Sequence, residues 1–196
     1  MKSKVVITIA RQFGSGGREV GEKLANQLGI PFYDKALIHL AAKESGIDED
    51  LFDFADEKSF RSFWNASAGN TGFYGNRISL FNSIRKLAEN GSCVIVGRCA
   101  DYILRGDEHT ISVFIHSSEQ DRLNRVIHTY GIPEKDAKDV MTKTDKKRAA
   151  YYNYYSGEKW GRADNYDLSI KSCASGIDGA VDLIIKFADL KQGVSK

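Results

Sequence analysis

The chain has 196 residues, of which 42% are hydrophobic and 28% charged, and a net charge of +2. This composition is typical of one compact globular domain, and the small net charge gives no reason to expect nucleic acid as a partner. The three cysteines, an odd number without metal-type pairing, indicate reduced thiols and a cytoplasmic protein, and no apolar run approaches the ~18 residues of a membrane span.

The first predicted element is a strand over residues 5–10, an apolar and β-branched run. It stops at a loop containing Gly14, Gly16 and Gly17, and apolar residues three and four apart then predict a helix. Strand, glycine loop and helix in this order are typical of a phosphate-binding loop, because the loop amides and the helix N-terminus favour an anion. The usual spacing, G-x-x-x-x-G-K-[ST], is not met, since its first glycine falls on Arg11 and its lysine on Gly17.

Further along the chain, a second short strand over residues 30–33 ends at Asp34, and a helix is predicted over residues 35–43. Residues 45–76 are rich in aromatic side chains and lack a clear period. We interpret them as a small helical insertion that ends in a flexible glycine-rich loop.

The remaining chain alternates between short apolar runs and helical patterns. Residue Ser118 suits the N-cap of one of these helices. Strands separated by helices predict an α/β fold with a five-stranded parallel sheet covered on both faces. The predicted strands are 93–96, 111–115 and 166–170, and the predicted helices are 77–89, 118–129, 134–155 (as one helix or two) and 177–190.

In an open parallel sheet, ligands bind beyond the carboxyl ends of the strands. The glycine loop follows Arg11 at the end of the first strand, Asp34 follows the second, and Gly97 and Arg98 follow the third. Two arginines and one carboxylate therefore meet beside an anion-binding loop, which predicts a site for phosphorylated ligands.

These motifs resemble those of the P-loop nucleoside monophosphate kinases, most closely the cytidylate kinase-like family. The resemblance extends from Ile7 to about Phe187 and is most specific over residues 9–21, 31–34, 96–98 and 148–155. It implies a three-layer P-loop NTPase fold in a single kinase-like domain. The implied parts are a core of residues 1–34, 77–130 and 163–196, an acceptor-binding insertion of residues 35–76, and a lid of residues 131–162.

The resemblance implies transfer of the γ-phosphoryl group of ATP, with Mg²⁺, to a small phosphorylated acceptor, foremost a pyrimidine nucleoside monophosphate such as CMP. With Gly17 at the lysine position, Arg18 or Arg11 is expected to supply the missing charge. Ser15 lies too near the start of the loop to replace the hydroxyl that normally holds Mg²⁺. The negative charge of Glu19 is compatible with bound phosphates only if its side chain points away or holds the metal. The implied phosphate and ATP site is Arg11, Gly14, Ser15, Gly16, Gly17, Arg18 and Glu19.

On the acceptor side, the resemblance implies that Asp34, Arg77 and Arg98 border the second substrate and that Arg98 holds its phosphate. The aspartate with which cytidylate kinases read the cytosine amino group is Cys99 here, so base choice stays open. The lid is expected to contribute Lys143, Lys147 and Arg148, and the nearby tyrosines to pack its base or a dimer contact. The expected catalytic residues are Arg18, Arg98 and Arg148, and no residue is predicted to be a resident metal ligand.

Three other readings of the chain remain. The first is a P-loop kinase of another small metabolite, and the second is a nucleotide-binding protein without catalysis. The third, a dinucleotide-binding protein, is less well supported, because the third glycine of that motif is absent at position 19. The expected partners are small-molecule nucleotides, with no nucleic acid and no membrane, and both a monomer and a homodimer are open.

Overall fold

The computed structural model describes residues 4–34 and 72–194. The predicted helix over residues 35–43 and most of the predicted insertion lie outside these ranges. The strands are β1 (Val6–Arg11), β2 (Phe32–Tyr33), β3 (Cys93–Val96), β4 (Thr110–His116) and β5 (Leu168–Lys171). The helices are α1 (Gly17–Leu28), α5 (Gly72–Glu89), α6 (Ala100–Ile103), α7 (Glu119–His128), α8 (Glu134–Ser156) and α9 (Ser172–Val194), with a short 3₁₀ turn at Ala163–Asn165.

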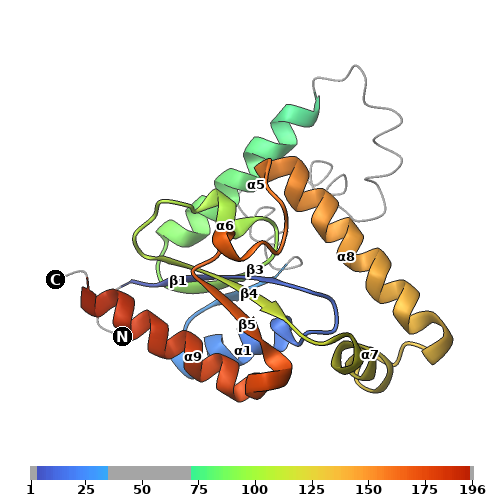
Figure 1. Cartoon of the computed structure of the whole chain (residues 1–196). Helices are drawn as coiled ribbons and strands as arrows, with labels where there is room; N and C mark the ends of the chain where they lie inside the picture. Colours follow the sequence, from blue (N-terminus) through green and yellow to red (C-terminus); the bar gives the residue numbers. More distant parts are fainter. Residues whose placement is uncertain (1–3, 35–71, 195–196) are drawn as a thin grey trace.

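The five strands form one parallel sheet in the order β2-β3-β1-β4-β5 (Figure 1). The central strand β1 pairs Val6 with Cys93 of β3 on one side, and Arg11 with Ile115 of β4 on the other. Since all strands run the same way, their carboxyl ends meet at one edge, where the glycine loop begins. The predicted five-stranded parallel sheet is confirmed.

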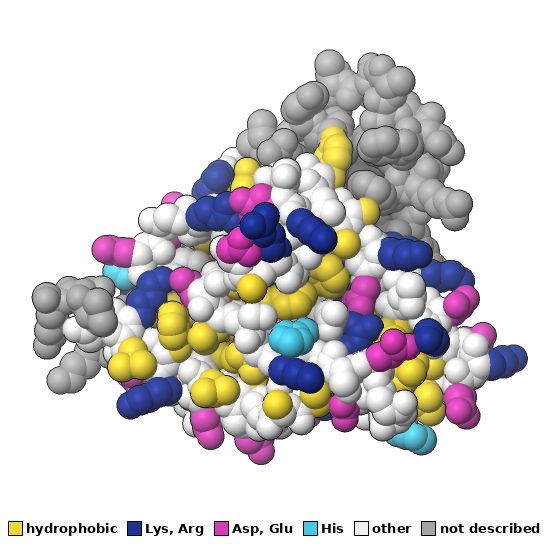
Figure 2. Space-filling model, viewed as in Figure 1, with side chains coloured by type: hydrophobic (Ala, Val, Ile, Leu, Met, Phe, Trp, Pro, Cys, Tyr) yellow, Lys and Arg dark blue, Asp and Glu magenta, His cyan; other side chains and the backbone are white. Residues whose placement is uncertain are grey.

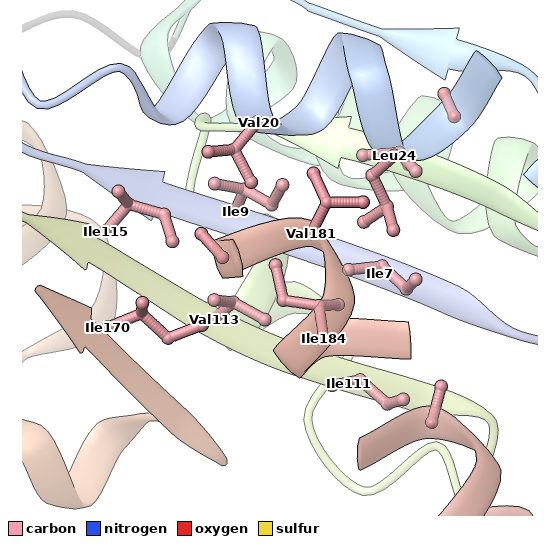
Figure 3. Packing of buried hydrophobic residues seen from close by; sticks show 14 of the residues in the cluster. Ile7, Ile9, Val20, Leu24, Ile111, Val113, Ile115, Ile170, Val181 and Ile184 are labelled. Atoms are coloured by element: carbon pink, nitrogen blue, oxygen red, sulfur yellow. The ribbon is translucent and has the colours of Figure 1, made fainter. Parts of the chain in front are cut away.

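Helices cover both faces of the sheet, as expected for buried parallel strands. On one face, Ile7 and Ile9 of β1 pack with Val20 and Leu24 of α1 and with Ile184 of α9 (Figure 3). The other face is covered by α5, α6 and the end of α8, because the alternate residues of β1 and β3 point there. The members of this second core include Val6, Ile84, Ile95, Ala100, Ile103 and Tyr152.

One sequence prediction needs correction, and one that was left open is now decided. Helix α5 begins at Gly72, five residues before the predicted start, so Gly72 and Gly75 lie in a helix and not in a flexible loop. Glycine is a poor helix former, but the 18-residue helix gains a hydrogen bond for each residue that is added to it. The low helix propensity of two glycines is therefore a weak guide to where it begins. Residues 134–155 form one continuous helix, α8, where two were also considered.

The predicted cap of α7 is confirmed, since the amide of Asp121 donates a hydrogen bond to Oγ of Ser118 at 3.2 Å. Helix α8 is long and rises past the carboxyl edge of the sheet to the second core, as Figure 1 shows on the right of the molecule. Within the ranges 4–34 and 72–194, no helix has the combination of length and apolar character that crossing a bilayer requires.

Candidate functional site

The glycine loop connects β1 to α1 at the carboxyl edge of the sheet. Gly16 is the N-cap of α1 with φ 77° and ψ 6°, a left-handed conformation that glycine adopts without strain. The first turn of α1 presents amides that lack acceptors within the helix, so this end of the helix suits an anion.

The hydroxyl of Ser15 lies inside the loop and not on its concave face. It donates hydrogen bonds to the carbonyls of Gln12 at 2.8 Å and Ile115 at 3.1 Å, and Ser15 is only 1% exposed. Ser172, at the start of α9, donates to the Ser15 carbonyl at 2.7 Å. Ser15 therefore shapes the loop, and its hydroxyl is not available to a phosphate or to Mg²⁺.

Gly17 stands where the usual motif has lysine, and the stem of Arg11 lies directly against it. A Cβ atom at position 17 would lie 2.5 Å from Cβ and 2.9 Å from Cγ of Arg11. The Arg11 guanidinium reaches the turn after β3, where its Nη1 fills the space that a Cβ at Gly97 would need. Arg11 thus extends from the loop towards the turn that carries Arg98.

Arg18 is half exposed and is held by two carboxylates. Its guanidinium pairs with Glu22 at 2.9 Å, one turn along α1, and with Asp34 at 3.1 Å. It also lies over the ring of Phe32, at 5.6 Å from the ring centroid. The structure therefore joins Arg18 to Asp34 at the end of β2, on the side where the acceptor is expected.

Glu19 is paired with an arginine that the sequence analysis did not single out. Nη1 of Arg125, on α7, lies 2.6 Å from Oε2 of Glu19. The Arg125 guanidinium also borders the loop, since a Cβ at Gly16 would lie 3.2 Å from its Cζ. Arg122 and Arg125 are three apart on α7 and so share a helix face, but their spacing does not indicate that this face meets the loop.

Helix α8 is tied to the loop by Asp145 and Arg148. The amide of Phe13 donates to Oδ1 of Asp145 at 2.7 Å, and Arg122 donates to Oδ2 at 2.5 Å. Arg148 donates to the carbonyl of Arg11 at 3.1 Å and lies 5.6 Å from the centroid of the Phe13 ring. Helix α8, which lies in the expected lid, thus contacts the loop directly through these two residues, which share a helix face as their spacing indicates.

The other expected lid cations lie away from these contacts. Lys143 is 72% exposed and pairs with Asp139 on its own helix at 3.2 Å, and Lys147 is exposed. Arg77 lies on α5, in the part of that helix whose side chains are outside the description.

The turn after β3 is strained. Gly97, Arg98 and Cys99 have φ values of 87°, 58° and 56°, and for a residue with a Cβ this left-handed conformation costs about 1–2 kcal/mol. Such strain is frequent at functional sites, where it aims a side chain. Here the Arg98 guanidinium lies over Tyr151 of α8, 5.5 Å from the ring centroid.

Burial governs the ionisation of the groups beneath this turn. Cys99 is 4% exposed and faces the second core, and burial raises its pKa, so it is the small buried residue that the sequence indicated. Burial also raises the pKa of Asp101 on α6 to about 6, against the opposing effect of a hydrogen bond with Tyr152. Tyr151, Tyr152 and Tyr155 of α8 pack against this core, whereas Tyr154 is exposed.

A pocket of about 320 Å³ opens beside the loop and was not predicted from the sequence. It lies between α7 and the start of α9, and Arg125 connects it to the loop. Cys173 is exposed there, and hydrogen bonds from Ser117 and Ser118 lower its pKa. The pocket is lined by Gly14, Ser117, Asp121, Asn124, Arg125, His128, Thr129, Ser172 and Cys173.

Among the described residues, no group of three or more His, Cys, Asp or Glu side chains is arranged to hold a metal ion. A Mg²⁺ ion carried by ATP needs only one or two protein oxygens, and carboxylates suit it. Asp34 fits this requirement better than the buried Ser15 hydroxyl, since it lies beside the first turn of α1.

Comparison with known proteins agrees with this architecture. A model of the cytidylate kinase-like family matches residues 6–174. No protein with a curated function matches significantly. The crystal structure of an uncharacterized protein from Eubacterium ventriosum ATCC 27560 is similar, with 37% identity and a TM-score of 0.75, covering 95% of this chain and 99% of that chain.

More distant structures share the fold. A shikimate kinase from Bacteroides thetaiotaomicron has 15% identity and a TM-score of 0.55, with 95% of this chain and 99% of that chain covered. A gluconokinase from Sinorhizobium meliloti 1021 has 16% identity and a TM-score of 0.57, with both chains covered completely at 100%. The fold is therefore that of P-loop kinases.

Proposed function

The chain belongs to the cytidylate kinase-like family, and from this premise we propose that it transfers the γ-phosphoryl group of ATP to a pyrimidine nucleoside monophosphate, with CMP as the first acceptor to test. The observation that carries the proposal is the arrangement at the carboxyl edge of the sheet. There the side chain of Arg11 lies against both Gly17, at the start of α1, and Gly97, in the strained turn that carries Arg98. On this proposal, a donor site and an acceptor site for phosphates would be adjacent.

On the donor side, the glycine loop would hold the β-phosphate of ATP with its amides. The pocket beside Arg125 is a fitting place for the nucleoside, since it opens directly beside Gly14 and the loop. Asp34 would contact the Mg²⁺ ion that ATP brings, and this ion would neutralise charge on the phosphates.

On the acceptor side, Arg98 would bind the phosphate of the nucleoside monophosphate, because a guanidinium binds such oxygens in a bidentate manner. The buried Cys99 thiol cannot reach a base in this site. The base must therefore be read by other residues, and the acceptor screen has to include UMP and the deoxynucleotides.

The reaction needs charge neutralisation more than it needs a base. An oxygen of the acceptor phosphate attacks the γ-phosphorus, the bond from this phosphorus to the β,γ-bridging oxygen breaks, and ADP leaves with the electron pair. The second pKa of a phosphate monoester is about 6, so the attacking oxygen is mostly deprotonated at neutral pH. Positioned arginines such as Arg98 and Arg148 fit this requirement.

A coupled ADP-release assay tests the proposal. Each nucleoside monophosphate is supplied with ATP and Mg²⁺, and ADP formation is followed at high enzyme concentration. We expect turnover with CMP or another pyrimidine nucleotide, and a loss of about 100-fold or more for Arg98→Met. Absence of turnover with every nucleoside monophosphate would refute the substrate class.

Two alternative functions follow from the fold and from the altered loop. The first alternative is a P-loop kinase of another small metabolite. Unphosphorylated metabolites therefore belong in the same acceptor screen, because one fold can serve several classes of acceptor. Binding without catalysis is favoured by Gly17 at the lysine position and by the Glu19–Arg125 pair. Isothermal titration distinguishes this last case, which requires ATP binding without ADP formation.

A further inference from the structure

The side chains at positions 11 and 17 compete for one space. Besides the overlap with Arg11, a Cβ at position 17 would lie 3.2 Å from Cβ of Ile115, which is tight but tolerable. The stem of Arg11 is therefore the main obstacle to a side chain at position 17. Conversely, a glycine at position 11 would free this space, and the usual motif has that combination, glycine first and lysine seventh.

The position of the Arg11 guanidinium is the second observation. It ends against Gly97, so it lies between the first turn of α1 and the turn that carries Arg98. During transfer, the phosphoryl group would occupy this junction between the donor loop and the acceptor arginine. The backbone of Arg11 is itself held, because Arg148 donates to its carbonyl.

The guanidinium groups of the neighbouring arginines on α1 and α7 point elsewhere. Arg18 pairs with Glu22 and Asp34 on the outer side of α1. Arg125 pairs with Glu19 next to the nucleoside pocket. Neither guanidinium crosses the loop towards the Arg98 turn, whereas that of Arg11 does.

We propose that Arg11 is the cation that replaces the missing lysine of the loop, by a reciprocal exchange in which the charged side chain has moved from position 17 to position 11. The inference rests on the proposed ATP-dependent phosphoryl transfer. Arg11 would bind the γ-phosphate of ATP and neutralise it during transfer. A planar guanidinium can bridge oxygens of donor and acceptor phosphates, which the ammonium of a lysine does less well.

A double-mutant cycle tests the exchange. The variants are Arg11→Gly, Gly17→Lys and the combination of the two, with Arg85→Met, an exposed arginine on α5, as the matched control. The readouts are ADP formation and the dissociation constants of ATP, ADP and AMP from isothermal titration. Circular dichroism checks that each variant is folded.

We expect Arg11→Gly to lower kcat/KM by about 100-fold or more and to remove the preference for ATP over ADP. The affinities for ADP and AMP should change little, because the loop amides still hold the β-phosphate. Gly17→Lys alone loses activity because its Cβ collides with Arg11. The double variant regains at least about tenfold over either single variant, since it restores the usual pairing of glycine and lysine. Arg85→Met behaves as the wild type.

Two results overturn the exchange. One is an Arg11→Gly protein that keeps the wild-type preference for ATP over ADP, and the other is a folded double variant no better than both single variants. If the lysine variants do not fold, Arg11→Met with the ATP and ADP titrations decides alone. If the wild type forms no ADP, but its preference for ATP over ADP is lost in Arg11→Met, the binding role of Arg11 is supported and the proposed function is refuted. A wild type without preference for ATP over ADP overturns the role of Arg11, whether or not it forms ADP.

Discussion

Replacement of Asp145 by alanine would measure how strongly α8 is fastened to the glycine loop. Its carboxylate accepts hydrogen bonds from the Phe13 amide at 2.7 Å and from Arg122 at 2.5 Å. The side chains of Arg122 and Asp145 are only 9% and 17% exposed, so the pair is largely removed from water. Loss of one partner of a buried ion pair costs about 3–5 kcal/mol.

Because Asp145 keeps some exposure, we expect the lower end of this range, about 3 kcal/mol of unfolding free energy. For a chain of this length, such a loss lowers Tm by about 6–12 °C. Asp145→Asn retains an oxygen acceptor for the Phe13 amide while it loses the charge, so its effect should be smaller.

Urea unfolding followed by circular dichroism gives the free energies, with m-values compared among variants. The control is Lys138→Met, which breaks the exposed pair between Lys138 and Glu119, whose side chains are 72% and 58% exposed. Because solvent screens this pair, it should contribute little to stability. If Asp145→Ala costs no more than Lys138→Met at equal m-values, the buried pair does not anchor the loop and the reasoning fails.

Three further predictions concern backbone strain, burial of charge and the pocket. Gly14→Ala should lower the free energy of unfolding in urea by at least about 2 kcal/mol more than Gly29→Ala. Both glycines have positive φ, but only at Gly14 would a Cβ meet backbone, 2.8 Å from the carbonyl oxygen of Arg122. Equal losses in the two variants would contradict this steric explanation. Burial raises the pKa of Asp101 from 3.8 to about 6, so its proton stabilises the fold at low pH and the unfolding free energy falls as pH rises from about 4 to 6. Asp101→Asn should abolish this decline, and an unchanged pH profile would argue against it. Cys173 should be the thiol that iodoacetamide alkylates fastest in the folded protein, and ATP should slow this reaction. If ATP gives no protection, the proposal that the nucleoside of ATP binds in this pocket is refuted.

Much of the fold could be predicted because the signals are local. Short, mainly apolar runs of four to six residues marked all five strands, and the run of β-branched residues before the glycine loop marked the central one. The start of α5 was placed five residues late because its first turns contain Gly72 and Gly75, which local rules assign to a loop. Local propensity does not register the hydrogen bonds that a longer helix adds.

The candidate site was predictable only in outline. The rule on carboxyl strand ends placed Arg11, Asp34 and Arg98 at one edge of the sheet, where their strands end. It gave no information about Asp145, which reaches Phe13 across 132 residues, or about Arg125, which reaches Glu19 across 106. Such pairs depend on how α7 and α8 pack beside the loop, and this packing has no local signature.

The sequence by itself therefore determined the order of the elements, the parallel sheet, the phosphate-binding context and the absence of a lysine at position 17. Only the tertiary structure decided which arginine side chain lies where the missing lysine at position 17 would supply its charge. Arg18 is the immediate neighbour of Gly17 in the chain, but one residue turns a helix by about 100°, so its side chain leaves the loop for Glu22 and Asp34. Arg11 is six residues away in sequence, yet the bend of the loop returns Gly17 to the end of β1 and lays the arginine stem across it.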